Sequence, residues 1–199
     1  MRTFIAINLP NIAKNNIKNA VAYAKDSLDF ASFTKEENLH ITLAFLGESD
    51  RSDILKIKEL LIKISKEMAP DKITINDIKI APDAASPKMI WLLTDEKTNI
   101  FIKSLSKKIK EELDSSRIKY DKTHETNSHL TVARFSNRWQ ESFVLKNDKQ
   151  KKEEILKIED TFPENINFSF DAHSVFLFES IQKDGERFYV PIFESNFFQ

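Results

Sequence analysis

Two short segments of this chain carry the same tripeptide, in which one apolar residue separates a histidine from a threonine. The tripeptides are His40-Ile41-Thr42 and His129-Leu130-Thr131. Alternate side chains of an extended strand lie on the same face, so each segment would present an imidazole and a hydroxyl together. The apolar residue between them would face a core. The pattern therefore predicts two strands, each with one polar face and one apolar face.

The apolar residues around these tripeptides recur at the spacings of strands and helices. We expect seven strands, at residues 2–8, 39–46, 72–81, 89–93, 128–135, 168–179 and 187–193. Apolar residues at steps of three and four predict three helices, at residues 12–28, 54–68 and 101–113. The alternation changes phase within 72–81, which predicts a bulge near Asp77. We expect the highly charged segment 138–160 to be irregular, apart from one short helix at 153–158.

Each half of the chain contains one His-x-Thr strand and one long amphipathic helix. The halves are residues 1–90 and 91–199. This arrangement indicates a loose internal duplication rather than a solenoid, because no short period repeats. A chain of 199 residues can form one core or two small lobes, so length alone leaves both arrangements open.

The composition excludes several classes of functional site. The chain has no cysteine, which rules out disulfides, thiolate nucleophiles and cysteine zinc sites. Its two glycines, Gly47 and Gly185, are isolated and begin no phosphate-binding loop. The net charge is −1, so any nucleic acid must be recognised locally. No segment is apolar enough to span a membrane and the first residues lack a signal-peptide pattern, so we expect a cytoplasmic protein without membrane contact.

The two imidazoles indicate acid–base chemistry on a phosphodiester. Cleavage needs a base for the attacking oxygen and an acid for the leaving oxygen, and two histidines near neutrality can divide these roles. The hydroxyls of Thr42 and Thr131 can donate to the non-bridging phosphate oxygens. A structural role is the alternative for a single histidine of this kind. Two copies in matching strands favour a shared site with catalytic His40 and His129.

A metal site is the other alternative for these histidines. Zinc sites usually have three or four ligands, several of them closely spaced in the sequence. The chain has neither His-x-His nor His-x-x-x-His, and His124 lies out of step with the strand face that carries His129. We therefore expect no metal and no other cofactor.

Longer blocks around the tripeptides are more specific than the tripeptides themselves. They are residues 2–10, 37–47, 129–134 and 178–180, with Gly185 and Tyr189. In these blocks the chain resembles the two-histidine phosphoesterases, in particular the bacterial and archaeal RNA 2′,3′-cyclic phosphodiesterases, also called 2′-5′ RNA ligases. The resemblance runs nearly from end to end, and the block 37–47 is its most specific part.

The resemblance implies an α+β fold in which residues 1–199 form a single bilobal domain. Two pseudo-symmetric antiparallel sheets would face a central cleft, with helices outside and one His-x-Thr motif from each lobe. The implied reaction opens an RNA or nucleotide 2′,3′-cyclic phosphate to a 2′-phosphate, and members of the family can also run a condensation that joins RNA ends through a 2′-5′ bond. His40 would protonate the leaving 3′ oxygen and His129 would activate water. No cofactor is implied, and we expect a monomer.

Arg134 matches an arginine of the second motif block, which implies a contact with phosphate. Strict alternation along the strand would place Arg134 on the face opposite His129, so a bulge or a strand end is needed to turn it. The alternative for Arg134 is a surface salt bridge. The chain also departs from the family at Ser128, where proline is usual, and at Ala44, where a basic residue is frequent.

Three other functions remain compatible with the sequence. Within the same fold, the substrate could instead be a 2′-5′ oligonucleotide or a small cyclic-phosphate metabolite. From a different class of protein, the chain could be a non-catalytic module that binds RNA ends. Two imidazoles too far apart to flank one phosphate would exclude two-histidine catalysis. The activity of variants that lack His40 or His129 separates the remaining functions.

Overall fold

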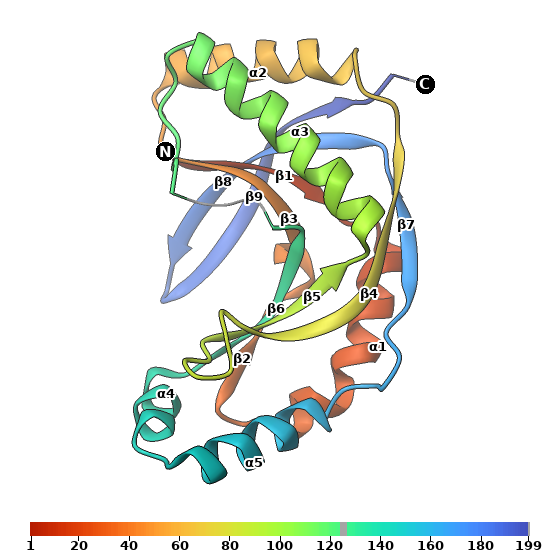
Figure 1. Cartoon of the computed structure of the whole chain (residues 1–199). Coiled ribbons are helices and arrows are strands. Elements are labelled where there is room, and N and C mark those ends of the chain that lie inside the picture. Colours follow the sequence, from red (N-terminus) through yellow and green to blue (C-terminus); the bar gives the residue numbers. More distant parts are fainter. Residues whose placement is uncertain (124–126, 199) are drawn as a thin grey trace.

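The computed structural model describes residues 1–123 and 127–198, which form two antiparallel sheets (Figure 1). The first sheet has the strand order β3-β1-β8-β9, and the second has the order β2-β6-β5-β4-β7. The strands of the first sheet are β1 (Arg2–Asn8), β3 (His40–Glu48), β8 (Ser174–Lys183) and β9 (Glu186–Asn196). Those of the second are β2 (Ala31–Phe33), β4 (Asp71–Ala81), β5 (Met89–Thr94), β6 (His129–Phe135) and β7 (Phe168–Ala172).

The helices lie outside the two sheets. In Figure 1, α2 lies above the first sheet, α3 runs from the level of β4 and β5 up across the first sheet to α2, and α1, α4 and α5 lie beside and below the second sheet. The α-helices are α1 (Asn11–Ser27), α2 (Arg51–Ser65), α3 (Glu96–Ser115), α4 (Asn137–Val144) and α5 (Asp148–Glu159), and η1 (Glu36–Asn38) is a short 3-10 helix. This arrangement confirms the predicted α+β fold with two lobes.

Local chemistry explains where the two most regular helices begin. Asp50 and Asp53 form a capping box at the start of α2, in which each side chain accepts from the other residue's backbone N–H. At the start of α3, the Asp95 side chain accepts from the Thr98 N–H. Both helices bury one apolar stripe, which confirms the helices predicted at 54–68 and 101–113.

Two apolar clusters hold the sheets in place. The main core joins both sheets to the helices and includes the fully buried Ile5, Ile41 and Leu130. A second, smaller cluster is separate from it and consists of Phe4, Ala6 and Phe178, with Phe176 and Tyr189 packed against them. The central strand β1 is therefore buried on both faces, as its burial pattern shows.

The lobes do not coincide with the two halves of the chain, so the loose internal duplication expected from those halves is wrong as a description of the lobes. The first sheet combines β1 and β3 with β8 and β9 from the other end of the sequence. The second sheet takes β2 and β4 from the first half. Periodicity identifies strands but carries no information about which distant strands pair. The sequence therefore did not show that each sheet combines strands from both halves of the chain.

Two further expectations are corrected by the structure. Segment 138–160 contains two helices, α4 and α5, rather than one short helix. Ser136 and Asn147 cap them, and only a few apolar side chains such as Trp139 and Ile155 anchor them, so charged residues dominate the sequence there. The strand expected at 168–179 is divided at His173 into β7 of the second sheet and β8 of the first. By contrast, a register shift between Ile75 and Asp77 confirms the predicted bulge in β4.

Candidate active site

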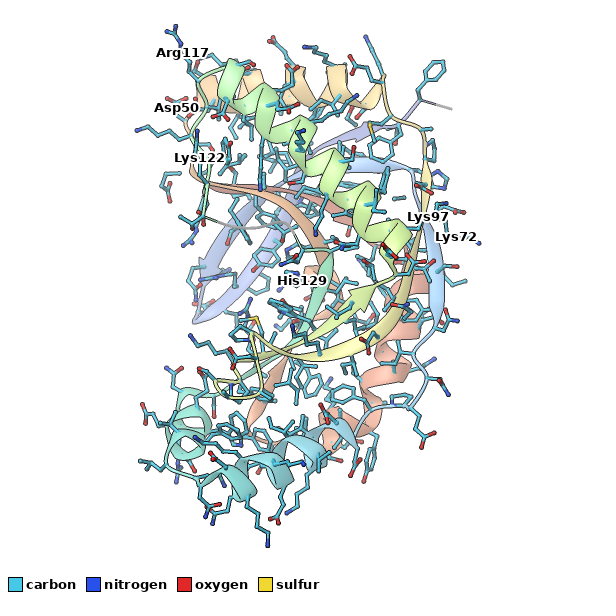
Figure 2. The ribbon with its side chains drawn as sticks, viewed as in Figure 1. Asp50, Lys72, Lys97, Arg117, Lys122 and His129 are labelled. Atoms are coloured by element: carbon cyan, nitrogen blue, oxygen red, sulfur yellow. The ribbon has the colours of Figure 1, made fainter. Side chains whose placement is uncertain are left out.

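The two His-x-Thr tripeptides begin β3 and β6, and these two strands contact each other across the two lobes. In Figure 2, His129 lies near the middle of the molecule, between the two sheets. The face of β3 and β6 that carries His40 and His129 is called the histidine face below. The five side chains expected in the site all come from these two strands.

Strand β3 alternates as the sequence predicts and then changes phase. His40 and Thr42 are partly exposed on the histidine face. Leu43 and Ala44 are then both buried, because the pairing with β1 shifts by one residue at this point. The phase change brings Phe45 back to the histidine face, where it is exposed. Ala44 belongs to the main core, so a basic side chain at position 44 would point into the core of this chain.

Strand β6 repeats this arrangement. His129 and Thr131 are partly exposed on the histidine face, and Val132 and Ala133 are both buried. The pairing with β5 shifts by one residue between Thr131 and Ala133, which leaves Val132 as the extra residue of a bulge. Arg134 is therefore exposed on the histidine face. The bulge resolves the direction of Arg134, which simple alternation would have placed on the opposite face.

Both imidazoles are held in the same way by the backbone. His40 Nδ1 lies 2.7 Å from the Asn38 carbonyl oxygen, and His129 Nδ1 lies 2.7 Å from the Asn127 carbonyl oxygen. A carbonyl can only accept a hydrogen bond, so each Nδ1 carries the proton. In the neutral rings, Nε2 is then the nitrogen that can take up a proton, which is the arrangement that acid–base chemistry requires.

Three aromatic rings surround the imidazole of His40. The ring centroids of Phe4 and Tyr189 lie 4.8 and 5.0 Å from that of His40, and the Phe178 centroid lies at 6.3 Å. Burial among these rings lowers the pKa of His40 from 6.5 to about 4, although the hydrogen bond to the Asn38 carbonyl opposes the shift. His40 is therefore neutral at pH 7 in the ligand-free chain.

Positive charge from the other lobe acts on the same ring. Both His129 and Arg134 lower the pKa of His40 further through charge repulsion. His129 and Arg134 belong to a different sheet, but their strand β6 contacts β3, which carries His40. The fold thus brings together the two histidines and Arg134 that the sequence singled out, and the strand alternation places Thr42 and Thr131 beside them.

Trp91 supports His129 from the neighbouring strand. Its ring stacks on the His129 imidazole, with the ring centroids 3.9 Å apart and the planes at 26°. Trp91 pairs with Thr131 in the sheet, so both side chains lie on the histidine face. Its Nε1 is buried and has no hydrogen-bond partner among the described residues. Trp91 is not among the predicted site residues, and the alternation within 89–93 is the only sequence signal for the direction of its side chain.

Arg134 makes no ion pair with a carboxylate among the described residues. Its Nη1 lies 3.7 Å from the thioether sulfur of Met89, which is a weak acceptor. The surface salt bridge that was the alternative for Arg134 is thus not seen in this part of the chain. Its guanidinium remains suited to bind an anion through two parallel hydrogen bonds.

The other two histidines lie outside this arrangement. His173 is exposed at the junction between β7 and β8. His124 lies outside the described residues. Within residues 1–123 and 127–198, no three His, Asp or Glu side chains gather in a way that could hold a metal ion. Over the same residues, no helix is long and apolar enough to cross a membrane.

Comparisons with known proteins identify the family of the chain. The family described as AKAP7 2′5′ RNA ligase-like domain matches residues 4–196. The RNA 2′,3′-cyclic phosphodiesterase of Methanocaldococcus jannaschii is 30% identical to the chain, over 90% of this chain and 91% of the relative. The protein of the same name from Archaeoglobus fulgidus is 28% identical, over 67% and 72% of the two chains.

A solved structure supports the fold independently. The crystal structure of E. coli LigT complexed with 3′-AMP covers 100% of this chain and 98% of its own, with a TM-score of 0.74 and 20% identity. The chain belongs to the 2′-5′ RNA ligase-like family of two-histidine phosphoesterases. The family predicted from the sequence is thereby confirmed.

Proposed function

We propose that this protein hydrolyses the 2′,3′-cyclic phosphate of an RNA end or nucleotide to a 2′-phosphate. The observation that carries the proposal is the pair of equivalent His-x-Thr strands, which present two imidazoles, two hydroxyls and one guanidinium on the histidine face. The names of the relatives from Methanocaldococcus jannaschii and Archaeoglobus fulgidus support the same reaction and the same substrate class.

The proposed reaction consumes one water molecule. The water oxygen forms a bond to phosphorus as the bond from phosphorus to the 3′ oxygen breaks. His129 takes the proton from water, and His40 gives a proton to the leaving 3′ oxygen. Thr42 and Thr131 donate to the non-bridging oxygens, and Arg134 binds the same phosphate through its guanidinium. With the 5′-hydroxyl of a second RNA end in place of water as the attacking group, the same steps join two RNA ends by a 2′-5′ bond, as the family description suggests.

The lowered pKa of His40 has a consequence for these roles. The ligand-free chain holds His40 neutral at pH 7, whereas an acid must carry a proton. The negative charge of a bound cyclic phosphate favours the protonated imidazole, so substrate binding would raise the pKa of His40. We propose that His40 acquires its catalytic proton together with the substrate. If His40 instead serves as the base, the same geometry works with the roles exchanged.

The proposal is tested by product analysis with a defined substrate. Purified protein is incubated with 2′,3′-cyclic AMP in the presence of EDTA, and the product is identified by phosphorus NMR. We expect 2′-AMP to form at the same rate with and without EDTA, because the proposed mechanism uses side chains alone. Formation of 3′-AMP would contradict the role of the 3′ oxygen as leaving group. Loss of activity in EDTA would contradict metal-free catalysis.

The same assay separates the alternative functions. Turnover of a 2′-5′ dinucleotide in preference to the cyclic nucleotide would favour a 2′-5′ phosphodiesterase. Tight binding of a cyclic-phosphate RNA end without turnover would favour a non-catalytic binding module. The proposal includes action as a monomer in the cytoplasm, which gel filtration and cell fractionation test.

A further inference from the structure

Asn38 connects two parts of the site that are far apart in the sequence. Its Nδ2 donates to the Arg187 carbonyl at 2.8 Å, and its Oδ1 accepts from the Tyr189 N–H at 3.0 Å. The two partners are alternate residues of β9, so the side-chain amide pairs with this strand edge as a neighbouring strand would. Asn38 is only 8% exposed, which shields both hydrogen bonds from water.

The same residue reaches His40 by two routes. Its backbone carbonyl accepts the hydrogen bond from His40 Nδ1 at 2.7 Å. Its side chain fixes the backbone of Tyr189, whose ring meets the His40 ring edge-on, with centroids 5.0 Å apart and planes at 88°. Tyr189 also packs edge-on against Phe4, which itself contacts His40. A shift of Asn38 would therefore disturb both the hydrogen bond and the aromatic surroundings of His40.

We propose that Asn38 is a positioning residue, which fastens the β8–β9 hairpin against His40 and so sets the orientation and water exposure of that imidazole. The inference rests on the proposed function only in that His40 is given a catalytic role. Asn38 acts through His40 and Tyr189 and takes no proton itself.

A nearby ion pair provides a matched control. Lys35 and Glu186 join the same two segments at 2.6 Å, and the Lys35 ammonium lies 5.3 Å from the centroid of the Phe188 ring. Both side chains are about half exposed, at 46% and 54%, so the pair is accessible to water and salt. No hydrogen bond or ring contact links this pair directly to His40 among the described residues. Removal of the Lys35 charge should slightly weaken the contact between residues 35–38 and β9, and it should leave the surroundings of His40 unchanged.

The test compares Asn38→Ala, Asn38→Asp and Lys35→Gln with the wild-type chain. Asn38→Asp keeps an acceptor for the Tyr189 N–H and loses the donor to Arg187, so it serves if the alanine variant does not fold. Steady-state kinetics gives kcat and KM for 2′,3′-cyclic AMP, and NMR titration of the imidazole gives the pKa of His40. Thermal unfolding confirms that each variant is folded at the assay temperature.

We expect Asn38→Ala to lower kcat by roughly tenfold to a hundredfold, with a smaller change in KM, because a misplaced catalytic group slows the chemical step. The pKa of His40 should rise toward its ordinary value as water enters. Asn38→Asp should lower kcat less than Asn38→Ala does, and because its carboxylate raises the pKa of His40 by itself, this variant is judged on kcat alone. Lys35→Gln should show neither effect. The inference fails if Asn38→Ala keeps the wild-type pKa of His40, or if Lys35→Gln changes kcat and that pKa equally.

The titration does not depend on turnover. If the wild-type chain hydrolyses no cyclic phosphate, the proposed function is contradicted, while the pKa of His40 in the variants still tests the role of Asn38. Conversely, unchanged titration in an active enzyme would contradict only the role of Asn38.

Discussion

Arg134 occupies on β6 the place that Phe45 occupies on β3. Each lies five residues after its histidine, beyond a bulge, on the histidine face. The two strands are therefore equivalent in backbone and different in chemistry, since one presents a guanidinium and the other an aromatic ring. This difference makes an otherwise near-symmetric pair of motifs directional, because an anionic phosphate is attracted more strongly toward the strand that carries Arg134.

Replacement of Arg134 by glutamine should weaken catalysis without unfolding the chain. The side chain is exposed and makes no carboxylate ion pair among the described residues, so we expect a change in unfolding free energy within about 0.5 kcal/mol. Loss of a charged phosphate contact should lower kcat/KM by about 10- to 100-fold, or roughly 1.4–2.8 kcal/mol. Steady-state kinetics with 2′,3′-cyclic AMP measures the effect, and a variant with wild-type kcat/KM would show that Arg134 does not contact phosphate.

Loss of the Arg134 charge should also change the titration of His40. Arg134 is one of the groups that lower the pKa of His40, so Arg134→Gln should raise that pKa. The shift should be modest, because burial is the largest cause and remains. NMR titration of wild type and variant measures it, and an unchanged pKa would contradict an electrostatic effect of Arg134 on His40.

The fold should lose stability in moderate acid because of His40. The pKa of this group is lowered on folding from 6.5 to about 4, so the unfolded chain takes up the proton first as the pH falls. The contribution is full above pH 6.5, declines between about pH 6.5 and 4, and does not decline further below that range. Urea unfolding at several pH values should show this slope in wild type and a smaller slope in His40→Asn. Equal slopes in the two proteins would contradict the lowered pKa.

Much of this site could be predicted from the sequence, because its residues lie close together on two strands. Alternation alone placed His40 beside Thr42 and His129 beside Thr131, and the structure keeps both pairs. Alternation failed at Arg134, because the one-residue bulge at Val132 depends on pairing with a distant strand. The link between Asn38 and Tyr189 was equally hidden, since the two residues are 151 positions apart and no local pattern marks such a contact.

Ser128 offers a test of a buried polar group next to the second motif. Its hydroxyl is buried and has no partner among the described residues, so Ser128→Ala removes an uncompensated polar atom. We expect the unfolding free energy to stay level or rise by about 1 kcal/mol. Ser106→Ala is the matched control, because the Ser106 hydroxyl is buried and donates to the Leu43 carbonyl at 2.6 Å. That variant should lose about 1–3 kcal/mol, and urea unfolding compares the two. Equal losses in both variants would mean that Ser128 has a partner.

Trp91 should act on His129 through its ring rather than its N–H group. Trp91→Phe removes the unpartnered Nε1 and keeps an aromatic ring against the imidazole. We expect stability to change by no more than about 1 kcal/mol and activity to be retained. Trp91→Ala removes the stack and should cost about 3 kcal/mol together with much of kcat. Unfolding curves and kinetics of both variants measure this, and full activity in Trp91→Ala would show that the stack does not position His129.

The central claim is that His40 and His129 together carry out the reaction, and histidine variants test it most directly. The measurement is the rate of 2′,3′-cyclic AMP hydrolysis by wild type, His40→Ala, His129→Ala and the control His173→Ala, whose side chain is exposed at the β7–β8 junction. We predict that each of the first two substitutions lowers kcat on the order of a thousandfold, as expected for loss of a general acid or base. His173→Ala should keep wild-type activity. Retention of activity in either His40→Ala or His129→Ala, with the chain folded, would contradict the account.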